Sequence, residues 1–231
     1  MNSPGPKLRY HNSQRSDGFS LLELLIGMAV ILVIMSMTST LLVRALNTRS
    51  RENQRSDGLA DAQRALNIMT REIANTGFGL TNNGIIAADS GLTTIRVRAN
   101  LNAFDGQSTS LVVNDRNEDV KYSLYSAADA SYIVRLDIGT ENQTTVLANR
   151  VDSLKFRYYS EKINYTMATA DCDISTTSPE VTDKSQTKYI VMSICVQLPQ
   201  VGSPGSSGYQ PLSRVQLVSD VWLRNADIGN Y

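Results

Sequence analysis

An apolar segment at residues 19–43 constrains this chain more than any other feature. It contains 25 residues, and Glu23 is its only charged side chain. A helix rises about 1.5 Å per residue, so a run of this length can cross a hydrocarbon core about 30 Å thick. A carboxylate inside that core costs about 2.5–3.5 kcal/mol on insertion scales. Glu23 is therefore a candidate functional residue.

Two ordinary explanations of this segment fit poorly. A secretory signal peptide has a shorter apolar core, whereas this run is long, carries Glu23 near its start and ends without a clear small-x-small cleavage site. A plain membrane anchor fits the length but gives no reason for Glu23 or for the Gly18–Phe19 junction. Lys and Arg flank the segment on both sides, so charge alone does not orient it.

The residues at the start of the segment, GFSLLELLI at 18–26, resemble the processing motif of the type IV pilin-like family. This family comprises type IV pilins, minor pilins and type II secretion pseudopilins. The resemblance implies cleavage by prepilin peptidase after Gly18, N-methylation of the new amino terminus at Phe19, and an assembly role for Glu23. It also implies a leader in the cytoplasm and a body outside the inner membrane, destined for a pilus or pseudopilus.

A physical argument supports the assembly role of Glu23. After cleavage, Phe19 would carry an ammonium group, and an isolated amine or carboxylate in a low-dielectric filament core costs several kcal/mol. Pairing Glu23 with the Phe19 amine of a neighbouring subunit would offset both costs and set the axial register. The alternative is that Glu23 merely reaches the lipid headgroups.

The charge of the expected mature chain argues against a nucleic-acid surface. Removing the leader takes away three cations and Asp17, which leaves 19 Lys and Arg against 21 Asp and Glu. A nucleic-acid-binding face needs a basic patch. We therefore expect no direct nucleic-acid binding.

The near absence of histidine argues against catalysis. The single histidine, His11, lies in the leader, so the mature chain would have none. Ser-His-Asp and Cys-His catalysis and histidine-ligated metals are then excluded. Residues 115–126 echo a calcium loop but have Val120 and Ser126 where Gly and Glu are needed, so we expect a hairpin turn. We expect no catalytic residues, metal or cofactor; an anchored hydrolase using carboxylates is the enzymatic alternative.

The two cysteines, Cys172 and Cys195, lie in the part expected outside the cytoplasm. An even count in an oxidising compartment favours a disulfide. Closing a loop of this length would stabilise the fold by about 3 kcal/mol in the chain-entropy model. Two unpaired cysteines are the alternative.

Helix is predicted to continue past the membrane to about residue 75. An apolar stripe steps by three and four residues, which is typical of one helix face. Its members are Leu59, Ala62, Leu66, Met69 and Ile73. Gly77 is the expected end of the helix, and Gly58 is the one weak point within it.

Period-two alternation after residue 84 predicts antiparallel strands. The predicted strands are residues 95–98, 111–113, 120–125, 132–136, 154–158, 189–198 and 215–223. The expected fold class is α+β and pilin-like: a long N-terminal helix, transmembrane in its first half, packed on an antiparallel β-sheet.

Four segments follow along the chain. Residues 1–18 are the expected leader, 19–43 the transmembrane and assembly half of the helix, 44–76 its extracytoplasmic amphipathic half, and 77–231 an antiparallel β domain. Within that domain, the polar loop 166–187 resembles the variable disulfide-bounded region of pilin-like proteins, a natural surface for partners; a solvated loop is the alternative. Residues 199–211, rich in Gly, Ser and Pro, look like a flexible connection.

The end of the helix points to a subfamily. The sequence REIANTGFG at residues 71–79 resembles PilW-type minor pilins and related J-type pseudopilins. The prediction is a minor type IV pilin that initiates, primes or caps a filament. Its expected partners are prepilin peptidase, other pilins through the N-terminal helix, and the inner-membrane assembly platform. The alternatives are a type II secretion pseudopilin and a membrane-anchored adhesion or binding domain that never polymerises.

Overall fold

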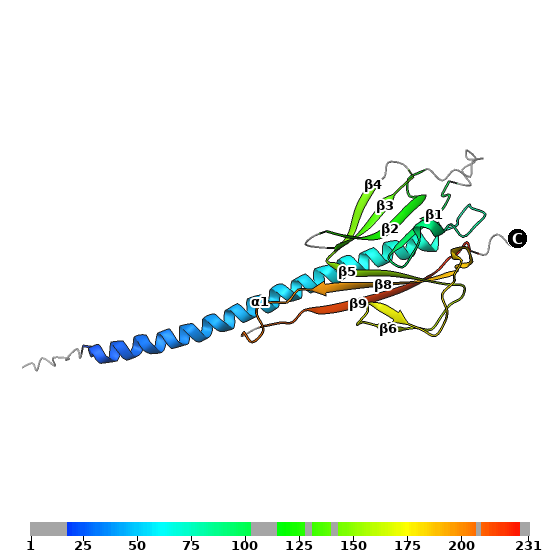
Figure 1. Ribbon diagram of the computed structural model, residues 1–231. Helices are drawn as coiled ribbons and strands as arrows, with labels where there is room; N and C mark the ends of the chain where they lie inside the picture. The colour runs from blue at the N-terminus through cyan, green and yellow to red at the C-terminus, as the bar shows by residue number, and fades with distance from the viewer. Residues whose placement is uncertain (1–17, 103–114, 128–130, 140–142, 207–208, 227–231) are drawn as a thin grey trace, which may run out of the picture. The chain divides into compact units, whose positions relative to one another are not determined.

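The computed structural model describes residues 18–102, 115–127, 131–139, 143–206 and 209–226. Two compact units divide the chain, Met1–Leu46 and Asn47–Tyr231. One helix, α1 (Leu21–Ala74), runs through the boundary between them (Figure 1). The rest of the described structure is antiparallel β-sheet, which agrees with the α+β class predicted from the sequence.

The first unit contains the apolar half of α1. It is the only candidate membrane span in the described part of the chain, and none of its apolar window is buried within the protein. Hydroxyl groups at residues 38–40 bond back to the helix itself: Thr38 and Ser39 each donate to the carbonyl four residues earlier, at 2.8 Å. Such bonds satisfy polar groups where no water is present. This half of the helix is therefore compatible with an apolar surrounding on every side.

The second unit contains two antiparallel sheets. Sheet A has the order β1-β2-β3-β4, with strands Thr94–Arg98, Asp119–Ser126, Ser131–Asp137 and Gln143–Asn149. Sheet B has the order β5-β8-β9, with strands Val151–Tyr159, Tyr189–Leu198 and Ser213–Trp222. A small hairpin pairs β6 (Thr166–Ala168) with β7 (Asp173–Ser175), and short 3-10 helices lie at Ala87–Asp89 and Lys184–Gln186.

The second half of α1 lies between the two sheets, and all three form one hydrophobic core (Figure 1). The predicted apolar stripe is the buried face of this helix, with Leu59 half-buried at its start. Fully buried members of the core include Leu66, Met69 and Ile73 from α1, Ile95, Tyr122 and Ile133 from sheet A, and Phe156, Met192 and Ile194 from sheet B. Each such aliphatic side chain contributes about 1.5–3 kcal/mol. The sequence predicted docking on one sheet; two sheets pack against the helix instead.

A partly buried ion pair between Glu72 and Arg135 joins α1 to sheet A. The Glu72 carboxylate accepts hydrogen bonds from Nε of Arg135 at 3.0 Å and from the hydroxyl of Tyr122. Arg135 also donates to Oδ1 of Asn117 at 2.7 Å. Burial, and then the neighbouring Glu72, raise the pKa of Tyr122 well above its usual value. The phenol therefore stays protonated and continues to donate to Glu72.

The end of α1 is capped from two directions. Gly77 adopts a left-handed φ of 81°, and its N–H donates to the carbonyl of Arg98 at 2.9 Å. The last carbonyls of the helix are taken by the C-terminal segment: N–H of Arg224 binds Ala74, and Nδ2 of Asn225 binds Asn75 at 3.2 Å. The helix thus ends at Ala74, three residues before the glycine predicted to stop it.

Gly58 is not a weak point of the helix but a point of close packing. It is buried within α1, and a Cβ added there would lie 2.9 Å from Cγ1 of Val196 on β8. A glycine in a helix normally costs about 1 kcal/mol relative to alanine. Here the missing side chain lets the helix approach sheet B.

Replacing Gly58 by Ala should therefore destabilise the protein, although alanine is the better helix former. Overpacking against a stiff valine costs about 1–3 kcal/mol, which exceeds the gain in helix propensity. We expect a net loss of about 1 kcal/mol in urea unfolding of the full chain in detergent. Ser56→Ala, at an exposed position of the same helix, is the control and should be neutral or stabilising. A stabilised Gly58→Ala protein would contradict the packing argument.

Candidate functional site

The predicted cleavage and assembly residues lie together at the start of α1. Gly18, Phe19 and Ser20 precede the helix, which begins at Leu21. Ser20 accepts the first helical hydrogen bond, from N–H of Leu24 at 3.1 Å. Phe19 is 81 % exposed, and nothing lies within 4 Å of a Cβ built on Gly18. Gly18 and Phe19, the residues of the predicted cleavage site, are thus exposed and lie outside regular structure.

Glu23 lies in the first turn of the helix. A carboxylate there is favoured by the partial positive charge of the helix N-terminus. In the described part of the chain no side chain forms a hydrogen bond or ion pair with Glu23. Its neighbours on the helix are exposed and apolar: Leu21, Leu22, Leu24 and Leu25 are all more than half exposed. A helix that is apolar all round is suited to a membrane or to the centre of a helical bundle.

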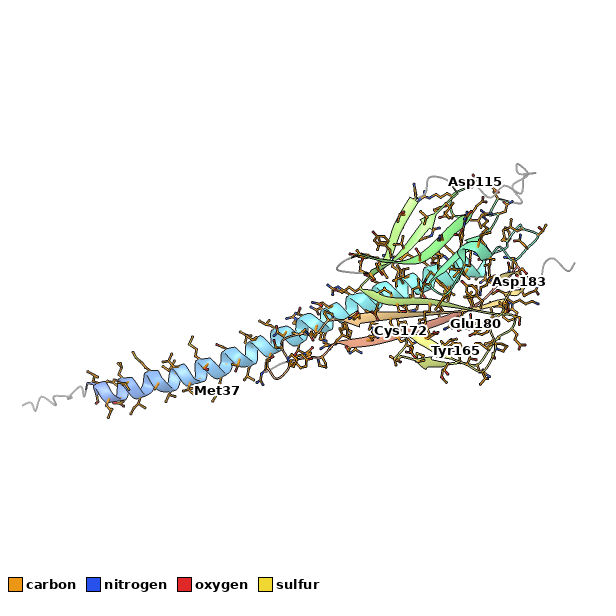
Figure 2. All side chains as sticks on the ribbon, in the orientation of Figure 1. Met37, Asp115, Tyr165, Cys172, Glu180 and Asp183 are labelled. Atoms are coloured by element: carbon orange, nitrogen blue, oxygen red, sulfur yellow. A yellow bond between two sulfur atoms is a disulfide. The ribbon has the colours of Figure 1, made fainter. Side chains whose placement is uncertain are left out.

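The second candidate site is a segment at residues 160–187, which we call the lid. Its β6–β7 hairpin covers the face of sheet B that points away from α1, and Tyr165 and Cys172 lie on this side of the sheet (Figure 2), whereas Val181 packs against the main core. The predicted disulfide is present in the structure: Cys172 of the lid is bonded to Cys195 of β8, with their Cα atoms 5.8 Å apart. Both cysteines are buried.

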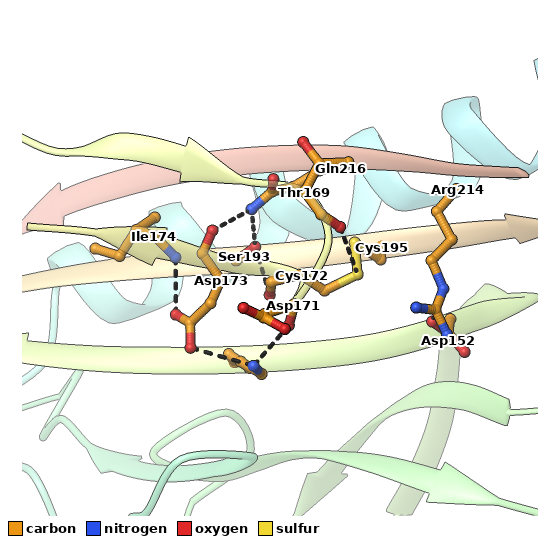
Figure 3. The surroundings of a disulfide bond; sticks show 11 residues. Asp152, Thr169, Asp171, Cys172, Asp173, Ile174, Ser193, Cys195, Arg214 and Gln216 are labelled. Carbon is orange, nitrogen blue, oxygen red and sulfur yellow. Dashed lines mark hydrogen bonds and ion pairs between the residues drawn. A yellow bond between two sulfur atoms is a disulfide. The ribbon is translucent and has the colours of Figure 1, made fainter.

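Hydrogen bonds fix the lid on both sides of this disulfide (Figure 3). The hydroxyl of Ser193 donates to the carbonyl of Cys172 at 3.1 Å. Nε2 of Gln216 donates to the carbonyl of Asp173 at 2.6 Å and to the Ser193 hydroxyl at 2.9 Å. Cys172 has a left-handed φ of 52°, which turns the chain sharply at the bond. Side chains of β8 and β9 therefore both bind backbone carbonyls of the lid.

A carboxylate next to the disulfide binds two cations of β5. Asp173 pairs with Nζ of Lys155 at 3.1 Å and with Nε and Nη2 of Arg157, whose Nη1 binds Glu180 at 2.5 Å. Burial alone would raise the pKa of Asp173. The hydrogen bonds from Arg157, from N–H of Ile174 and from Lys155 outweigh it and hold the pKa below its usual value.

A small hydrophobic cluster lies beneath the lid. Its buried members are Tyr159, Ile163, Tyr189 and Val191. The carboxylate of Asp220 accepts from the hydroxyls of Tyr165 and Tyr189, at 3.2 and 2.5 Å. Burial, together with Asp220, raises the pKa of Tyr165 to about 12. The lid is thus a packed layer on sheet B, and its exposed outer side, which includes Met167, is the part available to partners.

Acid should release the lid. Because the folded-state pKa of Asp173 is depressed, the ion pairs stabilise the lid above the unfolded-state pKa of about 3.9 and are lost as pH falls through the lower folded-state value. Trp222, the only tryptophan of the chain, lies 6.1 Å from the Tyr189 ring and reports on this region. We expect its fluorescence to change below about pH 4. In Asp173→Asn the change should already be present at neutral pH; an unaltered titration in that variant would contradict this assignment.

The segment predicted to be a flexible connection is anchored to α1. The guanidinium of Arg51, which is buried, donates to Oε1 of Gln210 at 2.9 Å, to the carbonyl of Pro211 at 2.6 Å and to the hydroxyl of Ser213 at 3.0 Å. A bridge between Val201 and Gln210 closes the segment on itself. The end of the segment is therefore held at α1 by a partner about 160 residues away, which composition does not reveal.

The predicted turn at the start of the calcium-loop echo is present: residues 115–118 form a turn leading into β2. The strand predicted at residues 111–113 lies outside the described residues. No group of three or more His, Cys, Asp or Glu suited to a metal ion occurs in the ranges that the structure describes.

Comparison with known proteins gives one match. A family model described as the prokaryotic N-terminal methylation motif matches residues 13–39. This range contains Gly18, Phe19 and Glu23 and most of the exposed apolar helix. No curated protein and no solved structure matches the chain.

Proposed function

Because this chain belongs, by its N-terminal methylation motif, to the type IV pilin-like proteins, we propose that it is a minor type IV pilin. Prepilin peptidase cuts after Gly18, and the new amino terminus at Phe19 is methylated. The subunit waits in the inner membrane, with its N-terminus cytoplasmic and its body on the periplasmic side. It then joins a pilus and initiates, primes or caps it. The motif at the start of an exposed apolar helix is the observation that carries this proposal.

In this proposal, Glu23 and Phe19 join neighbouring subunits. Glu23 has no partner in the described part of its own chain, and the side chains around it are exposed and apolar. In a filament core the Phe19 amine of the adjacent subunit is the complementary charge, and pairing offsets the desolvation of both groups. Residues 19–43 are then the assembly segment, and the body from residue 77 onward is displayed on the surface.

The minor rather than the major role is supported by the sequence around the end of α1. The Arg71–Gly79 segment is similar to PilW-type subunits, and the helix lacks the proline that major pilins often carry in its membrane half. The J-type pseudopilin of type II secretion shares the first feature and is the alternative within the family. A structural role rather than an enzymatic one agrees with the family.

An anchored adhesion or binding domain is the alternative of another class. The lid is the feature that favours it, because a disulfide-pinned layer on an exposed sheet face is a rigid surface for a ligand. Such a protein would need the membrane half of α1 but not pairing of Glu23. Filament incorporation therefore separates the two functions.

The N-terminus of the chain tests processing directly. Mass spectrometry of the N-terminal peptide, from membranes and from sheared filaments, should detect N-methylated Phe19 in both fractions. We expect a small share of the filament mass, as a minor subunit requires. A chain that still begins near Met1, or one cut after residue 43, would overturn the proposal. Gly18→Ala alters the predicted cleavage site and should leave unprocessed chain in the membrane.

A further inference from the structure

The two sheets have four outer edges, and two are closed by the chain itself. On β1, N–H of Ile86 binds the carbonyl of Arg96 at 3.0 Å, and N–H of Arg98 binds the carbonyl of Gly84 at 2.8 Å. On β5, N–H of Phe156 binds the carbonyl of Leu92 at 2.7 Å. These bonds use the outward backbone groups that would otherwise pair with another strand.

A third edge, β9, carries charged side chains. Arg214 and Asp220 lie on this strand, and both are exposed. Charges on an edge strand are a usual means of preventing pairing with another chain, since a paired strand would have to desolvate them.

The fourth edge, β4, has neither protection. It lies at the outer side of sheet A (Figure 1), and in the described part of the chain the backbone of its residues 144–149 bonds only to β3. Its sequence, QTTVLAN, contains no charge and no proline, and residues 144–146 are exposed. A register shift opposite Ile133 and Val134 interrupts only the later part of the strand. In a regular antiparallel pair every second residue directs both N–H and C=O outward. The edge therefore offers an unused set of backbone donors and acceptors.

Side chains beside this edge indicate what a partner must carry. On the face turned away from α1, Val146 is paired with Val134 and is 52 % exposed, which suits an apolar or β-branched neighbour. On the other face, Thr145 is paired with Arg135, the residue that binds Glu72 of α1. The side chains of a strand added to β4 would alternate between two faces. One set would lie beside Val146 and Val134, and the other set would face α1.

The helix carries two exposed arginines, Arg64 and Arg71, on the face next to Glu72. Ile68 and Arg64 lie one and two turns before Glu72, along the line of α1 that faces β3. With Arg71 they line an open groove on the uncovered side of the helix. Arg64 and Arg71 are exposed, and neither forms an ion pair with an acid in the described part of the protein.

From these observations we propose that β4 is a docking edge for an extended segment of a different protein. The segment adds a fifth strand to sheet A through backbone hydrogen bonds. It places apolar side chains next to Val146 and acidic side chains over Arg64 and Arg71. Backbone pairing supplies affinity, and the alternating apolar and acidic pattern supplies specificity. The proposal does not depend on whether the protein polymerises.

Site-specific photocrosslinking in the producing cell identifies the segment. A photoreactive residue at Thr144 of β4 is compared with one at Ser219 of β9, in the full membrane-anchored chain. The expected result is a crosslink from Thr144 alone, to an acidic stretch of another protein. A crosslink to a second copy of this chain, or equal yields from both strands, would overturn the proposal.

A synthetic peptide of the crosslinked stretch then tests the chemistry. Its binding to the detergent-solubilised protein should protect amides of residues 144–146 from hydrogen exchange. Arg64→Glu with Arg71→Glu should weaken binding by at least about tenfold, and a peptide with its acids changed to lysine should bind this variant but not the wild type. Tyr125→Lys, on the same sheet but away from the edge, is the control and should leave affinity unchanged. Strand addition would be contradicted if the acidic and the lysine peptides bound both proteins equally well. It would also be contradicted if the protected amides lay outside residues 144–146.

Discussion

Glu23→Ala should remove the protein from filaments while leaving it in the membrane. Breaking a buried ion pair by removing one partner costs about 3–5 kcal/mol, because the other charge stays buried and unpaired. For the Phe19 amine of the neighbouring subunit this corresponds to a loss of incorporation of about a hundredfold or more. The ratio of protein in sheared filaments to protein in membranes measures it.

Two further variants separate charge from shape. Glu23→Gln keeps the size of the side chain but not its charge, so it should fail as Glu23→Ala does. Ser20→Ala, in the same exposed segment, should assemble normally. Mass spectrometry of the N-terminal peptide must show that every variant is still cut after Gly18. Normal incorporation of correctly processed Glu23→Ala would show that Glu23 has no part in assembly.

Removing the disulfide should have the largest effect on the stability of the body. Replacing Cys172 and Cys195 together by Ala releases the lid from β8, and the chain-entropy model gives a loss of about 3 kcal/mol for a loop of this length. Urea unfolding of the full chain in detergent measures the loss. Hydrogen exchange should show it first in residues 160–187 and in the adjacent part of sheet B.

The wild-type chain provides the matched control for this experiment. Both cysteines are buried, so a reductant should open the bond slowly in the folded protein and quickly in urea. Wild-type protein refolded from reduced, urea-unfolded chain should then be as unstable as the double variant. A double variant within 0.5 kcal/mol of the oxidised wild type would mean that Asp173, Gln216 and the hydrophobic cluster hold the lid without the crosslink.

The sequence allowed accurate prediction wherever one local pattern determines structure. The apolar stripe indicated the buried face of α1, and Gly77, which has a left-handed φ, indicated the turn that follows the end of the helix at Ala74. The strands with strong alternation or long apolar runs were also found: β8 spans the predicted residues 189–198. The strand β4 was missed because its first residues, Gln143 and two threonines, are polar on both faces. These first residues therefore show no alternating apolar pattern.

Features that depend on distant partners could not be predicted. Gly58 looks like a helix breaker until Val196 is placed beside it. The anchoring of the segment after β8 depends on Arg51, which reads from sequence as one more membrane-flanking cation. The sequence of α1 shows one clear apolar stripe, so it did not indicate that the helix would pack against two separate sheets. The candidate site at residues 18–23, by contrast, is contiguous, and its pattern was visible without any fold.

The capping of α1 by the C-terminal segment has a consequence for the timing of biosynthesis. The carbonyls at the end of the helix receive their donors from Arg224 and Asn225, about 150 residues later in the chain, and Arg51 receives its acceptors from residues 210–213. The body therefore cannot close around its helix until nearly the whole chain has left the ribosome. The apolar half of α1 needs no such partner and is complete within the first residues made. If the apolar half of α1 inserts into a membrane, as proposed, its insertion therefore precedes folding of the body.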